Sequence, residues 1–153
     1  MKQSFEKFLK DNDFLPYSNW DSFPLPHEIP KDETEANRNF KEIKNKVNRK
    51  SGLYVYEKDG RILYVGKARS LFGRIKSHYI ESYREVSGDT KKKSKFGANL
   101  WYRFFSENRG MVTIYWKELK EEKERQIIEK MLELVLLQSI EFEEFKRKCK
   151  EGN

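Results

Sequence analysis

The chain has 153 residues, which suffices for one hydrophobic core of ordinary size and is too short for two. An aromatic fraction of 14% argues against a disordered chain and indicates a small core rich in Tyr and Phe, although the mean hydropathy is only −0.95. Lys and Arg number 32 against 25 acidic residues, and the resulting formal net charge of +7 favours a polyanionic partner.

Composition also excludes several classes of protein. No apolar run approaches the roughly 18 residues that span a bilayer, and the first residues lack the apolar core of a signal peptide, so we expect a cytoplasmic protein with no membrane partner. Cys149 is the only cysteine, which excludes an internal disulfide. With only His27 and His78 beside it, no Cys/His zinc cluster can form, and a bound metal must be held mainly by oxygen ligands.

Residues 1–50 mix acidic and basic side chains almost evenly, and we expect them to form a partly helical N-terminal extension that packs on the core. Helices are predicted over residues 4–9 and 34–47, and apolar residues in the second recur at three- and four-residue spacing. Residues 15–30 contain the prolines and are predicted to be irregular chain held in place by aromatic side chains.

A β-hairpin is predicted in the next segment. Residues 52–57 and 61–66 are rich in β-branched and aromatic side chains, and Asp59-Gly60 between them is a favourable turn dipeptide. A helix should follow at once, because Ser70 can cap a segment in which apolar residues recur every four positions.

The remaining elements follow a lysine-rich polar loop at residues 89–95. A helix is predicted around residues 100–105, a third strand over 111–116 and a long helix over 121–142. Six apolar residues of the long helix are expected on its buried face: Ile127, Ile128, Met131, Leu132, Val135 and Leu136.

The elements together predict an α/β layered domain with a small, mainly antiparallel, three-stranded central sheet flanked by helices. We divide the chain into the extension of residues 1–50, a core domain of residues 51–145 and a basic C-terminal tail of residues 146–153.

The core domain carries a pattern that resembles the GIY-YIG endonucleases over roughly residues 51–140. The two tripeptides of the hairpin are Gly52-Leu53-Tyr54 and Tyr64-Val65-Gly66, with Leu and Val in place of two isoleucines. The second continues with Lys67-Ala68, as in the excision-repair nucleases of that family. Arg74 lies ten residues after Tyr64, where the family keeps an arginine, and Glu129 follows the third strand on the next helix, where the family has a carboxylate.

This resemblance implies a metal-dependent DNA endonuclease that hydrolyses phosphodiester bonds, with a GIY-YIG type layered fold. It implies that Tyr54 and Tyr64 converge on the attacking water, that Arg74 contacts the scissile phosphate, and that Glu129 binds one Mg²⁺ or Mn²⁺. Lys67 would supply a cation near Tyr64, which favours the phenolate of a residue whose ordinary pKa is about 10. Which tyrosine takes the proton stays open.

Three further acidic or basic positions qualify this interpretation. His78 lies four residues after Arg74, on the same helical face, where some restriction enzymes of the family have a histidine, so it is a candidate to contact phosphate or assist the tyrosine. Glu124 and Glu133 are close enough to Glu129 to be mistaken for it.

Glu141 stands where many family members have an asparagine that braces the site, about twelve residues after the metal-binding glutamate. Either another residue takes this role, with Asn99 as a candidate, or the end of the helix has diverged.

Basic residues gather around this pattern. Residues 58–95 hold 11 basic and 4 acidic side chains, as many extra positive charges as the whole chain has. Backbone phosphates could be gripped there without sequence readout, although a solvated surface is an equal alternative. The candidate DNA contacts are Lys67, Arg69, Arg74, Lys76, Lys91, Lys92, Lys93 and Lys95.

Two other functions remain open. The chain could be a catalytically inactive DNA-binding module with the same fold, or a structural or regulatory partner protein that uses residues 1–50 as its interface. A nuclease that cuts both strands would be expected to act as a homodimer.

Overall fold

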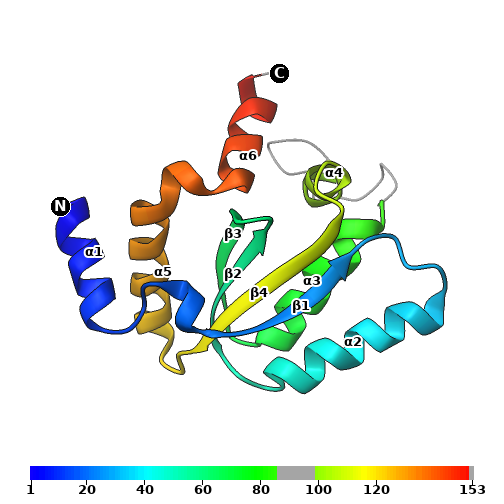
Figure 1. Ribbon diagram of the computed structural model, residues 1–153, viewed down its shortest axis with the longest axis horizontal. Helices are drawn as coiled ribbons and strands as arrows, with labels where there is room; N and C mark the ends of the chain where they lie inside the picture. The colour runs from blue at the N-terminus through cyan, green and yellow to red at the C-terminus, as the bar shows by residue number, and fades with distance from the viewer. Residues whose placement is uncertain (86–98, 152–153) are drawn as a thin grey trace.

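The computed structural model describes residues 1–85 and 99–151, which form an α/β fold of six α-helices packed on a four-stranded antiparallel sheet (Figure 1). Along the sheet, the strand order is β1-β4-β2-β3. The strands are β1 (Asp21–His27), β2 (Gly52–Lys58), β3 (Arg61–Ala68) and β4 (Gly110–Glu118). The predicted hairpin is confirmed, since β2 pairs with β3 through a turn at residues 59–60.

The three-stranded sheet predicted from the sequence is wrong by one strand. Strand β1 lies in the segment predicted to be irregular, and it pairs with β4 along its whole length, with Phe23 opposite Ile114. Its prolines mislead because Pro24 and Pro26 alternate with buried apolar residues, and β1 is an outer strand, where proline is tolerated. The N-terminal region therefore contributes one edge of the sheet.

The helices agree with the sequence except in the C-terminal part. They are α1 (Lys2–Asp11), α2 (Glu33–Val47), α3 (Leu71–Tyr83), α4 (Leu100–Ser106), α5 (Glu122–Leu136) and α6 (Glu141–Glu151), with short 3-10 turns η1 (Tyr17–Asn19) and η2 (Leu137–Ser139). The single long helix predicted over residues 121–142 is wrong, because α5 ends at Leu136. Ile140 then leaves the helical path and forms a bridge with Ile62 on β3.

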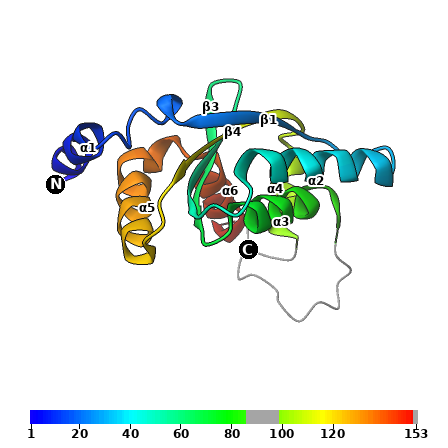
Figure 2. The same cartoon turned by 90° about the horizontal axis from the view of Figure 1, so that it is seen from below.

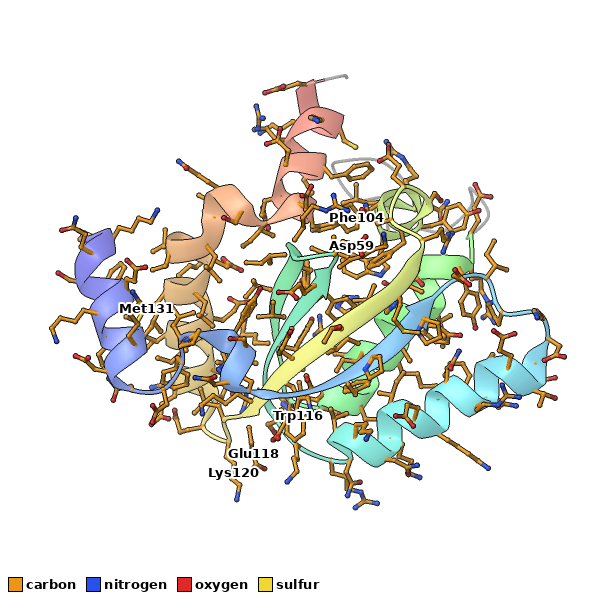
Figure 3. The ribbon with its side chains drawn as sticks, viewed as in Figure 1. Asp59, Phe104, Trp116, Glu118, Lys120 and Met131 are labelled. Atoms are coloured by element: carbon orange, nitrogen blue, oxygen red, sulfur yellow. The ribbon has the colours of Figure 1, made fainter. Side chains whose placement is uncertain are left out.

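One residue of the predicted buried face of this helix is also misplaced. Ile127 is 59% exposed, whereas Ile128, Leu132 and Val135 are buried at four- and three-residue spacing. Figure 3 shows Met131 on the side of α5 that faces α1. The apolar part of the buried stripe therefore begins at Ile128, and the neighbouring Ile127 is exposed to solvent.

The two faces of the sheet carry different helices. Residues paired across an antiparallel sheet lie on the same face, so Tyr54, Tyr56 and Tyr64 share the face that packs on α3 and α4. Figure 2 shows α2, α3 and α4 together on one side of β1 and β4. Leu53 and Lys67 are paired on the opposite face, and α5 packs beside the outer strand β3. Side chains from both faces can therefore meet around the free edge of β3.

Among the described residues, no helix has the length and apolar character needed to cross a bilayer.

Candidate active site

The hairpin positions the two tyrosines because two glycines allow close approach. A Cβ atom on Gly66 would lie 2.4 Å from the Tyr54 hydroxyl and 2.8 Å from the Tyr64 ring. On Gly52 it would lie 2.1 Å from the carbonyl oxygen of Lys117 on β4. A side chain at Gly66 would push the two rings apart, and one at Gly52 would push β2 away from β4, so Gly66 allows the close approach of the phenols and Gly52 that of the strands.

Tyr54 lies in the aromatic interior behind the site. It is 1% exposed, and its hydroxyl is 2.9 Å from Nε2 of His78 on α3. The imidazole stacks on Trp101 with ring centroids 4.3 Å apart and an interplanar angle of 26°. The Trp101 indole also donates a hydrogen bond of 2.8 Å to the His78 carbonyl. Helix α4 thus holds the histidine in place against Tyr54.

Tyr64 occupies the next position outward. Its ring centroid is 5.9 Å from that of Tyr54 and 5.4 Å from that of His78. Unlike Tyr54, it lines an open pocket of about 410 Å³ at the edge of β3. The pocket is lined by Tyr64, Lys67, Ala68, Arg69, Arg74, Glu122, Arg125, Gln126 and Glu129.

Glu129 reaches this pocket from α5 and pairs with a lysine of β3. Its Oε1 lies 3.6 Å from Nζ of Lys67, and its side chain is only 12% exposed. Burial and the charge of Glu133 raise the pKa of this carboxyl, while Lys67 and Lys130 oppose the rise. The charge of Glu129 in turn helps to raise the pKa of Tyr64, so the acid and the phenol are electrostatically coupled.

Arg74 lies at the mouth of the same pocket. The residue is exposed, at the first turns of α3, and forms no ion pair with any residue in the described ranges. Ser70 caps that helix by accepting a hydrogen bond of 3.1 Å from the backbone N–H of Gly73, as predicted. Arg69 is also exposed and lies 4.0 Å from Glu122 across the pocket. The guanidinium of Arg74 is therefore available for an anion.

Neither tyrosine is poised as a stable phenolate in this arrangement. Burial is the main cause that raises the pKa of Tyr54 and of Tyr64, and Arg74 opposes the rise in both. Lys67, expected from the sequence to supply a cation near Tyr64, lines the same pocket and forms an ion pair with Glu129. A tyrosine that takes a proton from water therefore needs a neighbouring group that can accept its own phenolic proton. Burial lowers the pKa of His78 to about 3, which keeps its imidazole neutral.

The pocket fits a cation held through a single protein carboxylate. No three His, Cys, Asp or Glu side chains gather closely enough within residues 1–85 and 99–151 to hold a metal by themselves. Glu129 is a largely buried carboxylate whose pKa is raised, so a cation beside it would relieve an unfavourable charge. Water and phosphate oxygens would complete the shell, as suits Mg²⁺ or Mn²⁺.

Of the other candidate DNA contacts, the structure describes Lys76 and places it away from the pocket. Lys76 lies over the Phe40 ring, with Nζ 4.8 Å from its centroid, and does not line the pocket. Lys91, Lys92, Lys93 and Lys95 lie outside the described residues.

Two other acidic residues named in the sequence analysis also lie away from the pocket. Glu124 is exposed on α5 and is absent from the pocket lining. Glu141 pairs with Arg61 at 3.5 Å, beside the turn of the hairpin that Asp59 marks in Figure 3, so it does not brace the site.

Comparisons with protein-family models, with curated protein sequences and with solved structures give no match.

Two residues near the site have no counterpart in the sequence analysis. Arg125 is 5% exposed, and its Nη1 donates to the carbonyl oxygens of Leu119 and Lys120 at 3.0 and 2.6 Å, which ties the start of α5 to the end of β4. Its position four residues before Glu129 was the available signal. Glu81 is exposed on α3, and its position three residues after His78 is the sequence signal that places it on the same helical face.

Proposed function

We propose that this protein is a metal-dependent DNA endonuclease of the GIY-YIG type that hydrolyses phosphodiester bonds. One observation carries the proposal: Tyr64, Arg74 and Glu129, distant in sequence, line the same pocket, with Tyr54 directly behind it. Phosphodiester hydrolysis requires an activated water and compensation for charge on the phosphoryl oxygens, and the pocket offers a group for each task.

The basic side chains of the pocket, together with a metal ion, would bind the phosphate. Arg74 presents a planar fork that suits two phosphoryl oxygens, and no described partner competes for it. Lys67, held beside Glu129, adds a second positive charge near the reacting group. A cation bound by Glu129 would polarise the phosphate and lower the pKa of a bound water.

The two phenols take part in removing the proton of the attacking water. Tyr64 is the one that lines the pocket, so it is the group that receives the proton of the attacking water. Tyr54, buried and 2.9 Å from Nε2 of His78, orients Tyr64 from behind. In this proposal Tyr64 is therefore the general base.

A plasmid-nicking assay tests the proposal. Wild-type protein with Mg²⁺ or Mn²⁺ should convert supercoiled plasmid to nicked circles, and Glu129→Ala should bind the plasmid without nicking it. Glu124→Ala is the matched control, because it removes an exposed carboxylate of the same helix that does not line the pocket. Nicking by Glu129→Ala at the wild-type rate would refute the role of the carboxylate.

A DNA-binding module without cleavage is the second candidate, and the place of Glu141 favours it. This residue stands where the family has its bracing asparagine, yet it pairs with Arg61 away from the pocket. A module of that kind would shift the plasmid without nicking in wild type and variants alike. A protein that only binds other proteins would show no salt-sensitive affinity for DNA.

A further inference from the structure

One nitrogen of the His78 imidazole contacts the Tyr54 hydroxyl, and the other has no hydrogen-bond partner among the described residues. Nε2 lies 2.9 Å from the Tyr54 hydroxyl, whereas Nδ1 is buried and has no hydrogen-bond partner among the described residues. A buried polar atom without a partner is costly, so its surroundings need explanation. The polar group that the structure places next to Nδ1 is the carboxylate of Glu81, one turn further along α3, with Oε2 at 4.0 Å.

The ring cannot easily turn to exchange its two nitrogens. Trp101 stacks on one side of it, and Tyr54 engages Nε2 at its far end. The side chain of Glu81, by contrast, is 57% exposed and free to change rotamer. His78 and Glu81 also line a common pocket of about 570 Å³, which shares Arg74 with the pocket at the edge of β3. A small movement of the Glu81 carboxylate within it would bring an oxygen within hydrogen-bonding distance of Nδ1.

Resting on the proposed nuclease function, we propose that Glu81 is a positioning residue that keeps the proton of neutral His78 on Nδ1, so that Nε2 is free to accept the Tyr54 hydroxyl proton. The other tautomer would leave a lone pair on Nδ1 facing a carboxylate, and two acceptors repel. A carboxylate that fixes the tautomer of a histidine in this way is a general device of proton-transfer sites.

This tautomer completes a path for one proton. As the water oxygen bonds to phosphorus, the water proton passes to the Tyr64 oxygen, the Tyr64 proton to the Tyr54 oxygen, and the Tyr54 proton to Nε2 of His78. The bond from phosphorus to the departing oxygen breaks, and that oxygen keeps the electron pair and takes a proton from solvent. His78 ends as an imidazolium whose Nδ1–H faces Glu81, and it returns one proton to solvent.

The path explains how buried phenols can serve as bases. Neither Tyr54 nor Tyr64 has to persist as a phenolate, a state that their burial disfavours. The developing imidazolium meets the Glu81 carboxylate on one side, while Arg74 opposes it. Glu81 therefore compensates a charge that the interior alone would not tolerate.

The tautomer of His78 can be read by NMR without any substrate. The chain has two histidines, and long-range proton–nitrogen spectra of imidazole-labelled protein distinguish Nδ1–H from Nε2–H in each. His27 is the internal reference, because its Nδ1 lies 3.1 Å from the Leu25 carbonyl oxygen and forms no ion pair with Glu81. A His78→Gln variant assigns the signals. Wild type should show Nδ1–H at His78, and Glu81→Gln should shift this histidine to the Nε2–H form with His27 unchanged.

The same variants are then assayed for cleavage at saturating DNA. Glu81→Gln should lower the rate about fivefold with unchanged DNA affinity, Glu81→Asp should restore most of it, and Glu42→Gln, which removes a distant helical carboxylate, should match wild type. An unchanged His78 tautomer in Glu81→Gln would overturn the proposal, as would a changed tautomer with an unaltered rate. Wild-type protein that cleaves no DNA would instead refute the proposed nuclease, and the NMR result would still test the placement of the proton.

Discussion

The interior and the rim of the candidate site differ in their contact with water. Tyr54 and His78 are 1% and 8% exposed and are surrounded by aromatic rings, whereas the side chain of Lys67 is 40% exposed and Arg74 is open to solvent. Charges at the rim can bind and release a polyanion, because water compensates them when the ligand leaves. The interior cannot hold a charge at low cost, so a proton that reaches His78 needs a compensating carboxylate such as that of Glu81.

Tyr64 lies at the boundary between these two regions, and its removal should have the largest effect. We expect Tyr64→Phe to slow cleavage by roughly 10²- to 10⁴-fold, the usual contribution of a general base. Tyr54→Phe should cost only about tenfold, because Tyr64 would remain in the pocket and could lose its proton slowly to solvent. Single-turnover cleavage rates measure both. A larger loss for Tyr54 than for Tyr64 would reverse the assignment of the base.

Arg74 tests the rim alone. Arg74→Lys keeps the positive charge but loses the planar fork, so we expect the cleavage rate to fall by about ten- to a hundredfold, as for hydrogen bonds to charged groups worth about 1.5–3 kcal/mol. DNA affinity and its salt dependence should hardly change, because the number of neutralised phosphates stays the same. Binding isotherms at several salt concentrations provide the check. Equal losses in rate and affinity would mean that Arg74 only binds DNA.

The interior also predicts how stability depends on pH. Burial lowers the pKa of His27 to about 4 and of His78 to about 3. Below pH 6.5, the ordinary pKa of histidine, both side chains are protonated in the unfolded chain but stay neutral in the folded chain. Both histidines therefore stabilise the fold at neutral pH, and this contribution to the free energy of unfolding falls as the pH drops toward 4. Between pH 7 and 5.5, each should lower the free energy of unfolding by about 1 kcal/mol.

Urea unfolding of wild type and His27→Phe at both pH values isolates one of these contributions. The variant keeps an aromatic ring against Phe105 and should lose less stability in acid than wild type by about 1 kcal/mol. The comparison between proteins is needed because burial raises the pKa of Glu81 and Glu129, and these carboxyls change stability with pH in the opposite direction. Identical losses in both proteins would contradict a neutral buried His27.

Elements with strong local signals can be predicted from the sequence, whereas elements that tertiary contacts determine cannot. The hairpin and the start of α3 carry their own turn and cap residues, Asp59-Gly60 and Ser70, so they were predicted. Strand β1 exists because β4 pairs with it, and its prolines concealed it. The end of α5 is set by the bridge from Ile140 to Ile62, which no helical pattern encodes.

The candidate site likewise contains residues that the sequence identifies and contacts that only the folded chain creates. The spacing of the two tyrosines and Arg74 is local and could be recognised in the sequence, whereas the meeting of Glu129 with Lys67 depends on how α5 packs beside β3. The 2.9 Å contact between Tyr54 and His78 needs both the strand and α3 in place. Glu81 looked like any exposed helical carboxylate, because the unpartnered nitrogen beside it appears only in the folded chain.

Glu141 should have the smallest effect of all, which makes it a test of where the site ends. Its ion pair with Arg61 is 3.5 Å long and both side chains are substantially exposed, so Glu141→Gln should lower the free energy of unfolding by less than about 1 kcal/mol. The cleavage rate should not change, because Glu141 lies near the turn of the hairpin and outside the pocket. A clear gain in rate for Glu141→Asn would show that this position braces the site after all, and the boundary between rim and scaffold would then have to include α6.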